Sequence, residues 1–406
     1  MKVLFFAPYI YDPRYPAFSR TSSGFGYMVN DILREVSQKQ ETYLLTHQFV
    51  EAYMDTYTAC KHTRFDFLKG IRFGNLVSGL KLFFTPKVSF GNRLRYLFYC
   101  LDAGSLERCI RKVNPDIIHI HGLTYQTKPV LELCERKGYR YLVTLHGLNG
   151  LEASVNLPQA EKVYERQALR MLEEKNRPVT VVSSGVKKGV VSGYQLTGKN
   201  VRVILNGTYL NDEQVTERAR EGYMLLCVGT VGQRKNQIQL IRACALLPEA
   251  VRRSLKVHIV GGMSEQIDIQ GEIDRRGLHD VVTYHGFVPR QEMESFWLSA
   301  DLNVVMSKSE GFGLSMIEGF SYGVPTVAFS DIDAMLDLYD PKAIQTIEVR
   351  EDQAVADALV QALEKDWDHE YIRKMAQKYS MQLIADQYNA EYMRIWKGDQ
   401  NVHQNA

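Results

Sequence analysis

The sequence lacks three features that would place the protein within a membrane or outside the cell. It has no uncharged apolar run approaching the roughly 18 residues that a membrane-spanning helix needs. Its six cysteines are scattered without a C-x-x-C pair, which favours inert, reduced thiols over a disulfide framework. No apolar segment with a small-residue cleavage site opens the chain, and residues 1–7 are predicted to contain the first strand instead. We therefore expect a cytoplasmic protein that reaches the inner face of the cell membrane only by peripheral contact.

A strong charge of either sign is also absent. The 49 Lys and Arg residues nearly balance the 47 Asp and Glu residues, for a formal net charge of +2, so the overall charge gives no reason to expect a nucleic-acid partner. With 45% apolar and 24% charged residues, the composition is that of an ordinary soluble protein. Its 406 residues exceed one ordinary core and suit two domains of roughly 200 residues each.

Short apolar runs alternate with helical patterns along the chain, which indicates parallel α/β structure. The nearly continuous apolar character of these runs is typical of sheets covered on both faces. A polar, charged stretch over 208–221 interrupts the alternation and is predicted to be an interdomain linker. The runs expected to be strands are 2–6, 42–46, 116–120, 141–145, 179–182 and 201–205 before the linker, and 224–228, 256–260, 281–284, 302–305 and 325–328 after it.

The most specific motif is Glu310-Gly-Phe-Gly-Leu-Ser-Met-Ile-Glu318, which follows a predicted strand and opens a predicted helix over 313–322. Its glycines allow a ligand close to the backbone. The free amides at a helix start carry the positive end of the helix dipole, which suits a phosphate. Eight residues advance a helix about 80° beyond two turns, so the two glutamates cannot act as a same-face pair. We expect them to contact different parts of one extended ligand.

This motif, with Gly319-Phe-Ser-Tyr-Gly-Val-Pro325 after it, resembles the E-x7-E motif of the retaining glycosyltransferases of family 4. The resemblance implies an α/β fold of the GT-B type, in which two Rossmann-like domains face an interdomain cleft. It implies an N-terminal acceptor-binding domain over 1–208 and a C-terminal nucleotide-sugar-binding domain over 222–380. A final helix at about 381–397 is expected to pack back on the N-terminal domain.

The resemblance also assigns roles within the motif. It places Glu310 at the donor sugar as a catalytic residue, and it gives the ribose hydroxyls to Glu318. The residues between them bind the donor, in part through their amides: Phe312, Gly313, Leu314 and Ser315.

A Gly-rich turn, Val228-Gly-Thr-Val-Gly-Gln-Arg-Lys-Asn236, lies between a predicted strand and a predicted helix over 236–247. Arg234 and Lys235 at the helix start can neutralise a diphosphate; the alternative is two solvated cations. The turn resembles the family's segment with an arginine after the first glycine and a lysine five residues later. Here Thr230 replaces that arginine, Lys235 is retained, and Arg234 can supply the missing charge. Gly229 and Thr230 are thus assigned to the donor, and Arg234 and Lys235 to catalysis.

Two predicted strands end in histidines, and the carboxyl ends of parallel strands border the crevice in which α/β proteins bind ligands. His146 of Val143-Thr-Leu-His-Gly147 is therefore a candidate catalytic residue, and the family has a histidine here near the donor sugar. His121 can line the acceptor side, although His119 shares its strand face and one of the two can serve packing instead. No carboxylate or cysteine has a ligand-like spacing to these histidines, so no metal site is predicted.

Ser22-Ser-Gly-Phe-Gly26 follows the first predicted strand. It is an incomplete G-x-G-x-x-G, which disfavours an NAD-linked oxidoreductase. In the family a Gly-rich loop here closes on the diphosphate or the acceptor, which assigns Gly24 and Gly26 to that role. Arg20 lies beside the loop and is available to an anionic acceptor.

The segment 67–101 contains no Asp or Glu but has eight aromatic residues. Basic residues among aromatics suit an anionic membrane surface or a lipid-phosphate acceptor. The same composition also fits a helical insertion whose aromatics pack inward, or a site for single-stranded nucleic acid. We expect peripheral contact with an anionic membrane and no nucleic-acid partner. The cations of the segment are Lys69, Arg72, Lys81, Lys87, Arg93 and Arg95.

Together with these motifs, the resemblance implies a retaining glycosyltransferase that moves a hexose-type sugar from a UDP- or GDP-linked donor to a glycan or lipid-linked acceptor. The expected setting is cell-surface polysaccharide or lipopolysaccharide biosynthesis. Neither a cofactor nor a metal is required, because Lys235, Arg234 and a helix dipole can stabilise the leaving diphosphate. Two alternatives stay open: an epimerase-like nucleotide-sugar enzyme of the same fold, and an inactive nucleotide-sugar-binding module.

Overall fold

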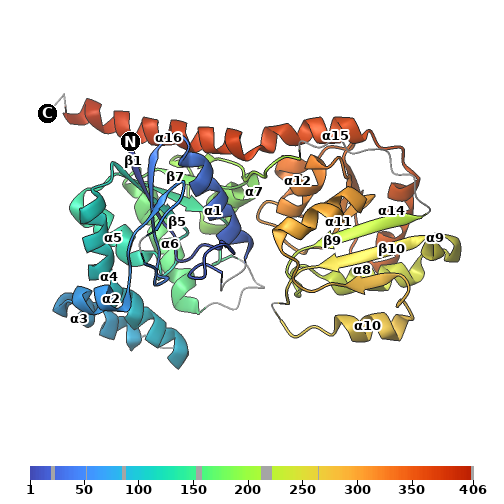
Figure 1. The fold of residues 1–406 in the computed structure, drawn as a ribbon, viewed down its shortest axis with the longest axis horizontal. Coiled ribbons are helices and arrows are strands. Elements are labelled where there is room, and N and C mark those ends of the chain that lie inside the picture. Colours follow the sequence, from blue (N-terminus) through green and yellow to red (C-terminus); the bar gives the residue numbers. More distant parts are fainter. Residues whose placement is uncertain are drawn as a thin grey trace. The chain divides into compact units, whose positions relative to one another are not determined.

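The computed structural model describes residues 1–19, 23–51, 53–84, 88–151, 158–211, 222–263 and 265–403. The chain forms two compact units: unit 1 comprises Met1–Asn206 and Met381–Ala406, and unit 2 comprises Gly207–Ser380. Each unit is built on one sheet with helices packed against it (Figure 1). Most of the predicted linker, residues 212–221, lies outside the described residues, while Thr208 at its start pairs with Ser380 at the end of unit 2.

The sheet of unit 1 has eight strands in the order β3-β4-β2-β1-β5-β6-β7-β8. The central strands are apolar on both faces and fully buried, which is why they pair in parallel beneath helices. The order reverses at β1, where the chain first adds β2 and later returns to add β5 on the other side. The strands are β1 Lys2–Phe6, β2 Glu41–Leu45, β3 Tyr53–Met54, β4 Thr58–Ala59, β5 Ile117–His121, β6 Tyr141–Leu145, β7 Val179–Val181 and β8 Val201–Val203.

The last helix of the chain belongs to unit 1. This helix, α16 (Met381–His403), packs against α1 (Gly24–Val36), so segments from the two ends of the chain are neighbours. Buried Tyr392 of α16 meets His119 of β5 with its hydroxyl 2.7 Å from Nδ1. The helix extends to His403, beyond the end expected near residue 397. The other helices around the sheet are α5 Lys128–Lys137, α6 Gln159–Glu174 and α7 Ser184–Lys188, followed by a π-helical turn, Gly189–Gly193.

The acid-free segment forms most of a three-helix lobe in unit 1: α2 (Arg64–Gly70), α3 (Phe73–Phe83) and α4 (Phe90–Val113). Both shorter helices pack on α4. The contacts are close because a Cβ on Gly70 would overlap the backbone of Ser105, and a Cβ on Gly79 would overlap the side chain of Leu97. The lobe is therefore a helical insertion between β4 and β5 in which α2 and α3 pack on α4.

A buried carboxylate fastens α4 to the sheet. Asp102 of α4 contacts His47 Nδ1 at 2.8 Å and His62 Nε2 at 2.7 Å. The other nitrogen of His47 lies 2.8 Å from the carbonyl oxygen of Gln126. Asp102 therefore joins α4 to two histidines, and His47 in turn joins it to the backbone at Gln126. Burial opposes ionisation of Asp102, but the hydrogen bonds and charges of the two histidines lower its pKa.

The sheet of unit 2 has six strands in the order β11-β10-β9-β12-β13-β14, and its pairings are parallel. The chain builds outward from β9 to β11 and then returns to place β12 on the other side of β9. The carboxyl ends of β9 and β12 thus form a topological switch point, where sheets of this kind bind ligands. The strands are β9 Tyr223–Val228, β10 Leu255–Val260, β11 Val282–Tyr284, β12 Leu302–Val305, β13 Thr326–Phe329 and β14 Ile344–Ile347.

Helices connect these strands in the alternation that the sequence indicated. α8 follows β9 and α12 follows β12, so each helix begins beside the switch point. The helices are α8 Gln237–Leu246, α9 Glu249–Arg253, α10 Ile269–Arg276, α11 Met293–Ser299, α12 Leu314–Ser321, α13 Met335–Leu338, α14 Asp352–Glu364 and α15 His369–Ala376, with short 3-10 turns at Arg290–Glu292 and Gln377–Tyr379. All eleven predicted strands match observed strands to within two residues at either end; β3, β4 and β14 were not predicted.

Candidate active site

The turn after β9 is held close to the sheet by glycines. Gly229 and Gly261 both have positive φ, +145° and +151°, and a Cβ on Gly261 would overlap the carbonyl oxygen of Gly229. The Gln237 side chain then braces the turn, because its Nε2 donates to the Gly229 carbonyl at 3.2 Å and its Oε1 accepts from the Gly232 amide. Thr230 is exposed beside them. The predicted donor turn is thus a tight loop at the switch point.

Arg234 and Lys235 join this turn to the loop after β12. The ammonium of Lys235 lies 2.5 Å from Glu310 Oε1, and the guanidinium of Arg234 lies 3.8 Å from Oε2. The backbones also meet: Lys308 donates its amide hydrogen to the Arg234 carbonyl at 2.8 Å. The structure therefore brings together the three residues of unit 2 that the sequence assigned to catalysis. It also shows their pairing with each other, which the sequence did not predict.

Glu310 is ionised in spite of its burial. Its side chain is 6% exposed, and burial alone would raise its pKa. The charges of Lys235 and Arg234, with hydrogen bonds from Lys235 and Ser307, outweigh burial and lower the pKa of this carboxyl. A negative charge thus lies against two positive charges at the switch point. An anionic ligand at these cations would compete with Glu310 for them.

The glycine-rich end of the loop starts α12. Gly313 is the N-cap with φ +92°, and among the residues that the structure describes no side chain caps this helix. Phe312 beside it is buried, with its ring 5.9 Å from that of Tyr379. Ser315 is also buried, Leu314 is partly exposed, and Glu318 is partly exposed one turn further along α12. The first turn of α12 is therefore available to an anion.

Two residues that sequence reasoning missed support this loop. The Ser307 hydroxyl donates to Glu310 Oε1. Arg350 stacks over the Phe329 ring at 4.1 Å, donates two hydrogen bonds to the Ser307 carbonyl and pairs with Asp331 at 2.6 Å. Ser307 lies only three positions before Glu310, and this short spacing could have indicated a contact between the two side chains. Nothing in the sequence around Arg350 connects it to this loop.

The histidines of unit 1 form a buried row at the carboxyl ends of β5 and β6. His146 Nε2 lies 3.0 Å from His121 Nδ1, and the ring of Phe25 packs edge-on against His146 at 5.0 Å. Burial lowers the pKa of His146 to about 4 and lowers that of His121 well below its usual range. Both are neutral near pH 7. His119 bonds to Tyr392 and Thr144 and serves packing, while His121 is fully buried with its Nδ1 facing His146.

The glycine loop of unit 1 has two different glycines. Ser23 caps α1 by accepting a hydrogen bond from the Gly26 amide at 3.0 Å. Gly26 is buried, and a Cβ there would press on the Tyr11 backbone, so its place is structural. Gly24, at the start of α1, is exposed. Arg20 and Ser22 lie outside the described residues.

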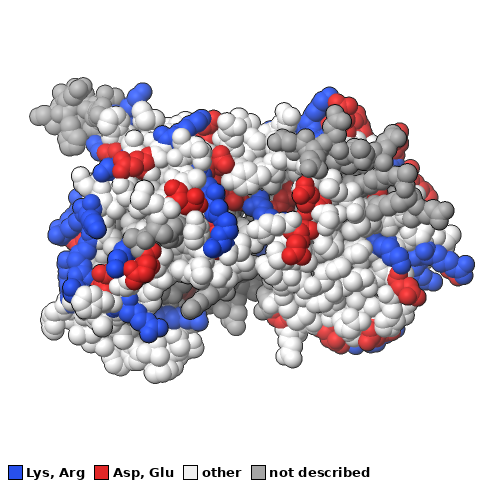
Figure 2. Space-filling view, in the orientation of Figure 1, with Lys and Arg blue, Asp and Glu red and all other residues white. Residues whose placement is uncertain are grey.

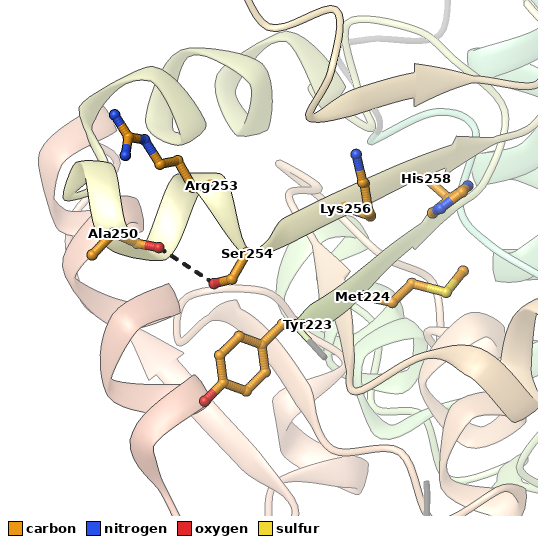
Figure 3. Close-up of a pocket in the computed structure, with 8 residues that line it drawn as sticks. Tyr223, Met224, Ala250, Arg253, Ser254, Lys256 and His258 are labelled. Atoms are coloured by element: carbon orange, nitrogen blue, oxygen red, sulfur yellow. Dashed lines mark hydrogen bonds between the residues drawn. The ribbon is translucent and has the colours of Figure 1, made fainter. Parts of the chain in front are cut away.

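A cavity of about 500 Å³ opens elsewhere in unit 2 (Figure 3). It lies at the amino ends of β9 and β10, so it is at the sheet edge opposite Gly229 and Lys235. None of the residues that the sequence assigned to the site lines this cavity. Its lining is Gly222, Tyr223, Met224, Ala250, Arg253, Ser254, Lys256 and His258.

Within the described ranges, no group of three or more His, Cys, Asp or Glu side chains is placed to hold a metal ion. None of the helices described is both long and apolar enough to cross a bilayer.

Two protein-family models match adjoining parts of the chain. The model described as "Glycosyl transferases group 1" matches residues 210–379, and the model described as "Glycosyltransferase Family 4" matches residues 72–212. Among curated proteins, a D-inositol 3-phosphate glycosyltransferase of Corynebacterium aurimucosum is 27% identical over 64% of this chain and 66% of its own length. One from an Arthrobacter species is 37% identical over 26% of each chain. An O-antigen chain mannosyltransferase B of Escherichia coli is 33% identical over 28% of this chain and 30% of its own. The chain thus spans only about a quarter of the length of the latter relatives.

Solved structures match nearly the whole chain. A sucrose-phosphate synthase from Thermosynechococcus elongatus aligns with a TM-score of 0.73 and 17% identity, covering 98% of this chain and 99% of that one. HepE of Anabaena, solved in complex with UDP and glucose, aligns with a TM-score of 0.64 and 16% identity, covering 97% and 100%. At these identities the likeness concerns the fold, and it confirms the predicted GT-B type.

Proposed function

The chain belongs to the family 4 glycosyltransferases, and we propose that it moves a hexose-type sugar from a nucleoside-diphosphate donor to a glycan or lipid-linked acceptor. The observation that carries this proposal is the cluster of Lys235, Arg234 and Glu310 at the switch point of unit 2, beside the uncapped start of α12. Two cations and a helix start suit a diphosphate. HepE, with the same fold, was solved with UDP and glucose, which supports a UDP-linked donor here.

Each residue at the switch point has a part in the proposed reaction. Lys235 and Arg234 bind the diphosphate and stabilise the charge that develops on it as it leaves. Glu310 then turns from Lys235 toward the sugar, and Glu318 holds the ribose. Phe312, Gly313, Leu314 and Ser315 position the donor at the start of α12, and Gly229 and Thr230 do so at the turn after β9. Because the side chains that hold the diphosphate are already cationic, the proposed reaction requires no metal.

The proposed transfer proceeds with retention on one face of the sugar. The bond between the anomeric carbon and the phosphate oxygen breaks, the acceptor oxygen bonds to that carbon, and the acceptor proton passes to the leaving phosphate. His146 is neutral, since its pKa is about 4. In this scheme it orients the donor sugar through hydrogen bonds and does not act as a cation, while His121 holds its ring. Gly24 and Arg20 are assigned to the acceptor.

The acceptor side of the proposal rests on the lobe formed by α2–α4. Its basic and aromatic residues favour peripheral contact with an anionic membrane and therefore a lipid-linked acceptor at the cytoplasmic face. The setting proposed is the biosynthesis of a cell-surface polysaccharide or lipopolysaccharide. The likeness to an O-antigen chain mannosyltransferase supports this setting.

A thermal-shift panel of UDP-, GDP- and ADP-sugars tests the donor. At least one should raise the melting temperature of the protein, and Lys235→Met should remove that rise. Arg242→Met in α8 is the matched control, because Arg242 is also a cation paired with a buried carboxylate, that of Glu272, but belongs to neither loop of the site. If no nucleotide sugar stabilises the protein, the donor proposal is wrong. NMR of the transfer product decides the configuration, and a product with the inverted anomeric centre excludes retention.

A further inference from the structure

The lobe formed by α2–α4 turns an apolar stripe toward solvent. Phe73, Val77 and Leu80 of α3, with Phe84 just after it, are spaced at i, i+4, i+7 and i+11, which places them on one side of a helix. All four are exposed, Phe73 by 81% and Phe84 by 71%. Scattered exposed apolar residues are ordinary on a protein surface, but a stripe along a whole helix is not.

This stripe is not the packing side of α3. The helix contacts α4 through Gly79, whose missing Cβ leaves room for the Leu97 side chain. Residues 76 and 83, which share that side at helical spacing, are partly buried. A helix on the surface of a water-soluble protein normally carries polar residues on the side away from its packing partner. The stripe lies about 100° around the helix axis from the side that carries Gly79, and its four apolar members are exposed within the described part of the chain.

Neighbouring helices extend the stripe. The ring of Phe83 is 6.0 Å from that of Phe90 at the start of α4, and Phe90 is 67% exposed. Phe65 and Leu68, on one side of α2, are each exposed as well. We call these eight residues the docking face: Phe65, Leu68, Phe73, Val77, Leu80, Phe84, Phe90 and Leu94.

Positive charge accompanies the docking face. The ammonium of Lys69 lies 4.1 Å above the Phe65 ring, and the Arg95 side chain is exposed one residue after Leu94. No acid lies between residues 67 and 101, and Asp66, just before them, is engaged in the capping box of α2. Figure 2 shows the outer part of this lobe, at the lower left, as white surface with blue along its inner margin. Lys87 and the side chain of Lys81 lie outside what the structure describes.

We propose that the docking face inserts into the headgroup region of an anionic bilayer, with its aromatic and aliphatic side chains among the upper acyl chains and its cations at the lipid phosphates. Amphipathic surfaces with this combination bind membranes in the interface plane. The inference deepens the proposed function, since it identifies the residues that would bring this enzyme to a lipid-linked acceptor. Because Asp102 ties α4 to His47 and His62, and Gly70 packs α2 closely on Ser105 of α4, the face is already formed before it meets the membrane.

Charge and side-chain type favour a bilayer over other occupants. A second copy of the chain would oppose the cations of one docking face to those of another, which is repulsive. Single-stranded nucleic acid could stack bases on the phenylalanines, but it would leave the aliphatic side chains of Leu68, Val77 and Leu80 without apolar cover. An anionic lipid surface complements both the charges and the aliphatic side chains.

Flotation with liposomes tests the proposal on the full-length protein. One set is neutral phosphatidylcholine and the other contains 30% phosphatidylglycerol. We expect the protein to float with the anionic set at low salt. The floating fraction should fall more than tenfold in the Phe73→Glu/Phe84→Glu variant. It should fall less in Lys69→Glu/Arg95→Glu, by an amount similar to that caused by raising the salt concentration. The matched control is Leu246→Glu, which places the same charge on an exposed leucine of unit 2 and should float like the unchanged protein. Quenching of Phe84→Trp fluorescence by brominated lipids reports insertion directly.

The outcomes separate this inference from the proposed function. Equal flotation of the Phe73→Glu/Phe84→Glu variant, flotation without anionic lipid, or no quenching overturns the docking face. If light scattering shows that the unchanged protein is a dimer and the variant is a monomer, the docking face binds a second copy of the chain instead. If the protein binds single-stranded RNA tightly, the face binds nucleic acid. The thermal shift of the same variant with nucleotide sugars should match the unchanged protein. If no protein responds to nucleotide sugars while flotation is as expected, the donor proposal fails and the docking face stands.

Discussion

Replacing Glu310 by Gln tests whether the cations of unit 2 are held ready for a diphosphate. The substitution keeps the shape of the side chain and one hydrogen-bond acceptor but removes the charge. Lys235 and Arg234 then lose the carboxylate that lies 2.5 and 3.8 Å from them. Two neighbouring cations without a counter-charge should destabilise unit 2 until an anion binds to them.

The size of the loss follows from the exposure of the three side chains. Removing one partner of a buried ion pair costs about 3–5 kcal/mol. The Glu310 side chain is 6% exposed, but that of Lys235 is 16% and that of Arg234 is 35% exposed. Because both cations keep some contact with water, we expect a lower loss of about 2–3 kcal/mol. In a unit of this size such a loss lowers the melting temperature by roughly 4–12 °C.

Differential scanning fluorimetry with UDP, GDP and ADP measures both the loss of stability and its recovery when a nucleotide binds. The nucleotide that stabilises the unchanged protein should raise the melting temperature of Glu310→Gln by a larger amount, since its phosphates no longer compete with a carboxylate. Sugar transfer should nevertheless fall on the order of 10²-fold, because the group assigned to the donor sugar has lost its charge. Tighter nucleotide binding together with slower sugar transfer would show that Glu310 competes with the diphosphate for Lys235 and Arg234.

Glu272→Gln provides the comparison. It removes a carboxylate bound by Arg242, Arg275 and Arg276, so it should lower stability and leave the response to nucleotide unchanged. A Glu310→Gln variant as stable as the unchanged protein would refute the energetic reasoning. A nucleotide response no larger than that of Glu272→Gln would show that the diphosphate does not use these cations.

Four further outcomes are expected. Asp102→Asn should cost about 1–3 kcal/mol in urea unfolding, because it weakens the buried hydrogen bonds that join α4 to His47 and His62; an unchanged midpoint would show that these hydrogen bonds do not stabilise the protein. Gly261→Ala should lower stability and abolish the nucleotide response, since its Cβ overlaps the Gly229 carbonyl at φ +151°; a normal response would show that the turn can shift. Arginine hydrogen bonds lower the pKa of Glu272 to about 2, so its stabilisation is complete above about pH 4.5 and is lost as the pH falls toward 2; Glu272→Gln should flatten that part of the stability profile. A chain ending at Ser380 should aggregate because it lacks Tyr392 and the rest of α16, and addition of a 381–406 peptide should restore solubility.

The sheets were predictable because most of their strands are mainly apolar. Runs such as those of β1, β6 and β12 coincide with the predicted bounds, and burial on both faces explains why. β14 escaped prediction because Ile344–Ile347, at the sheet edge, has two polar residues between its isoleucines. β3 and β4 are two residues each, too short for any period to be visible.

The individual residues of the candidate site were predictable, but the contacts between them were not. Glycines and charges at strand ends identified Lys235 and Glu310 separately, since each lies in a local motif. Their contact joins positions 75 apart in the sequence, and it depends on how two loops fold over one switch point. Arg350 and the trio of His47, His62 and Asp102 share this property. Local spacing carries no information about such pairings, because the sheet brings them together only after it has formed.

The position of α16 bears on the order in which the chain can fold during synthesis. Unit 2 is inserted between the sheet of unit 1 and the helix that completes it, so every residue of unit 2 leaves the ribosome before Tyr388 and Tyr392 do. Unit 2 can fold as soon as Ser380 emerges, whereas the larger sheet waits with the polar groups of His119 and Thr144 uncovered. The emergence of α16 is therefore the event that completes unit 1, so the unit that is begun first is completed after unit 2.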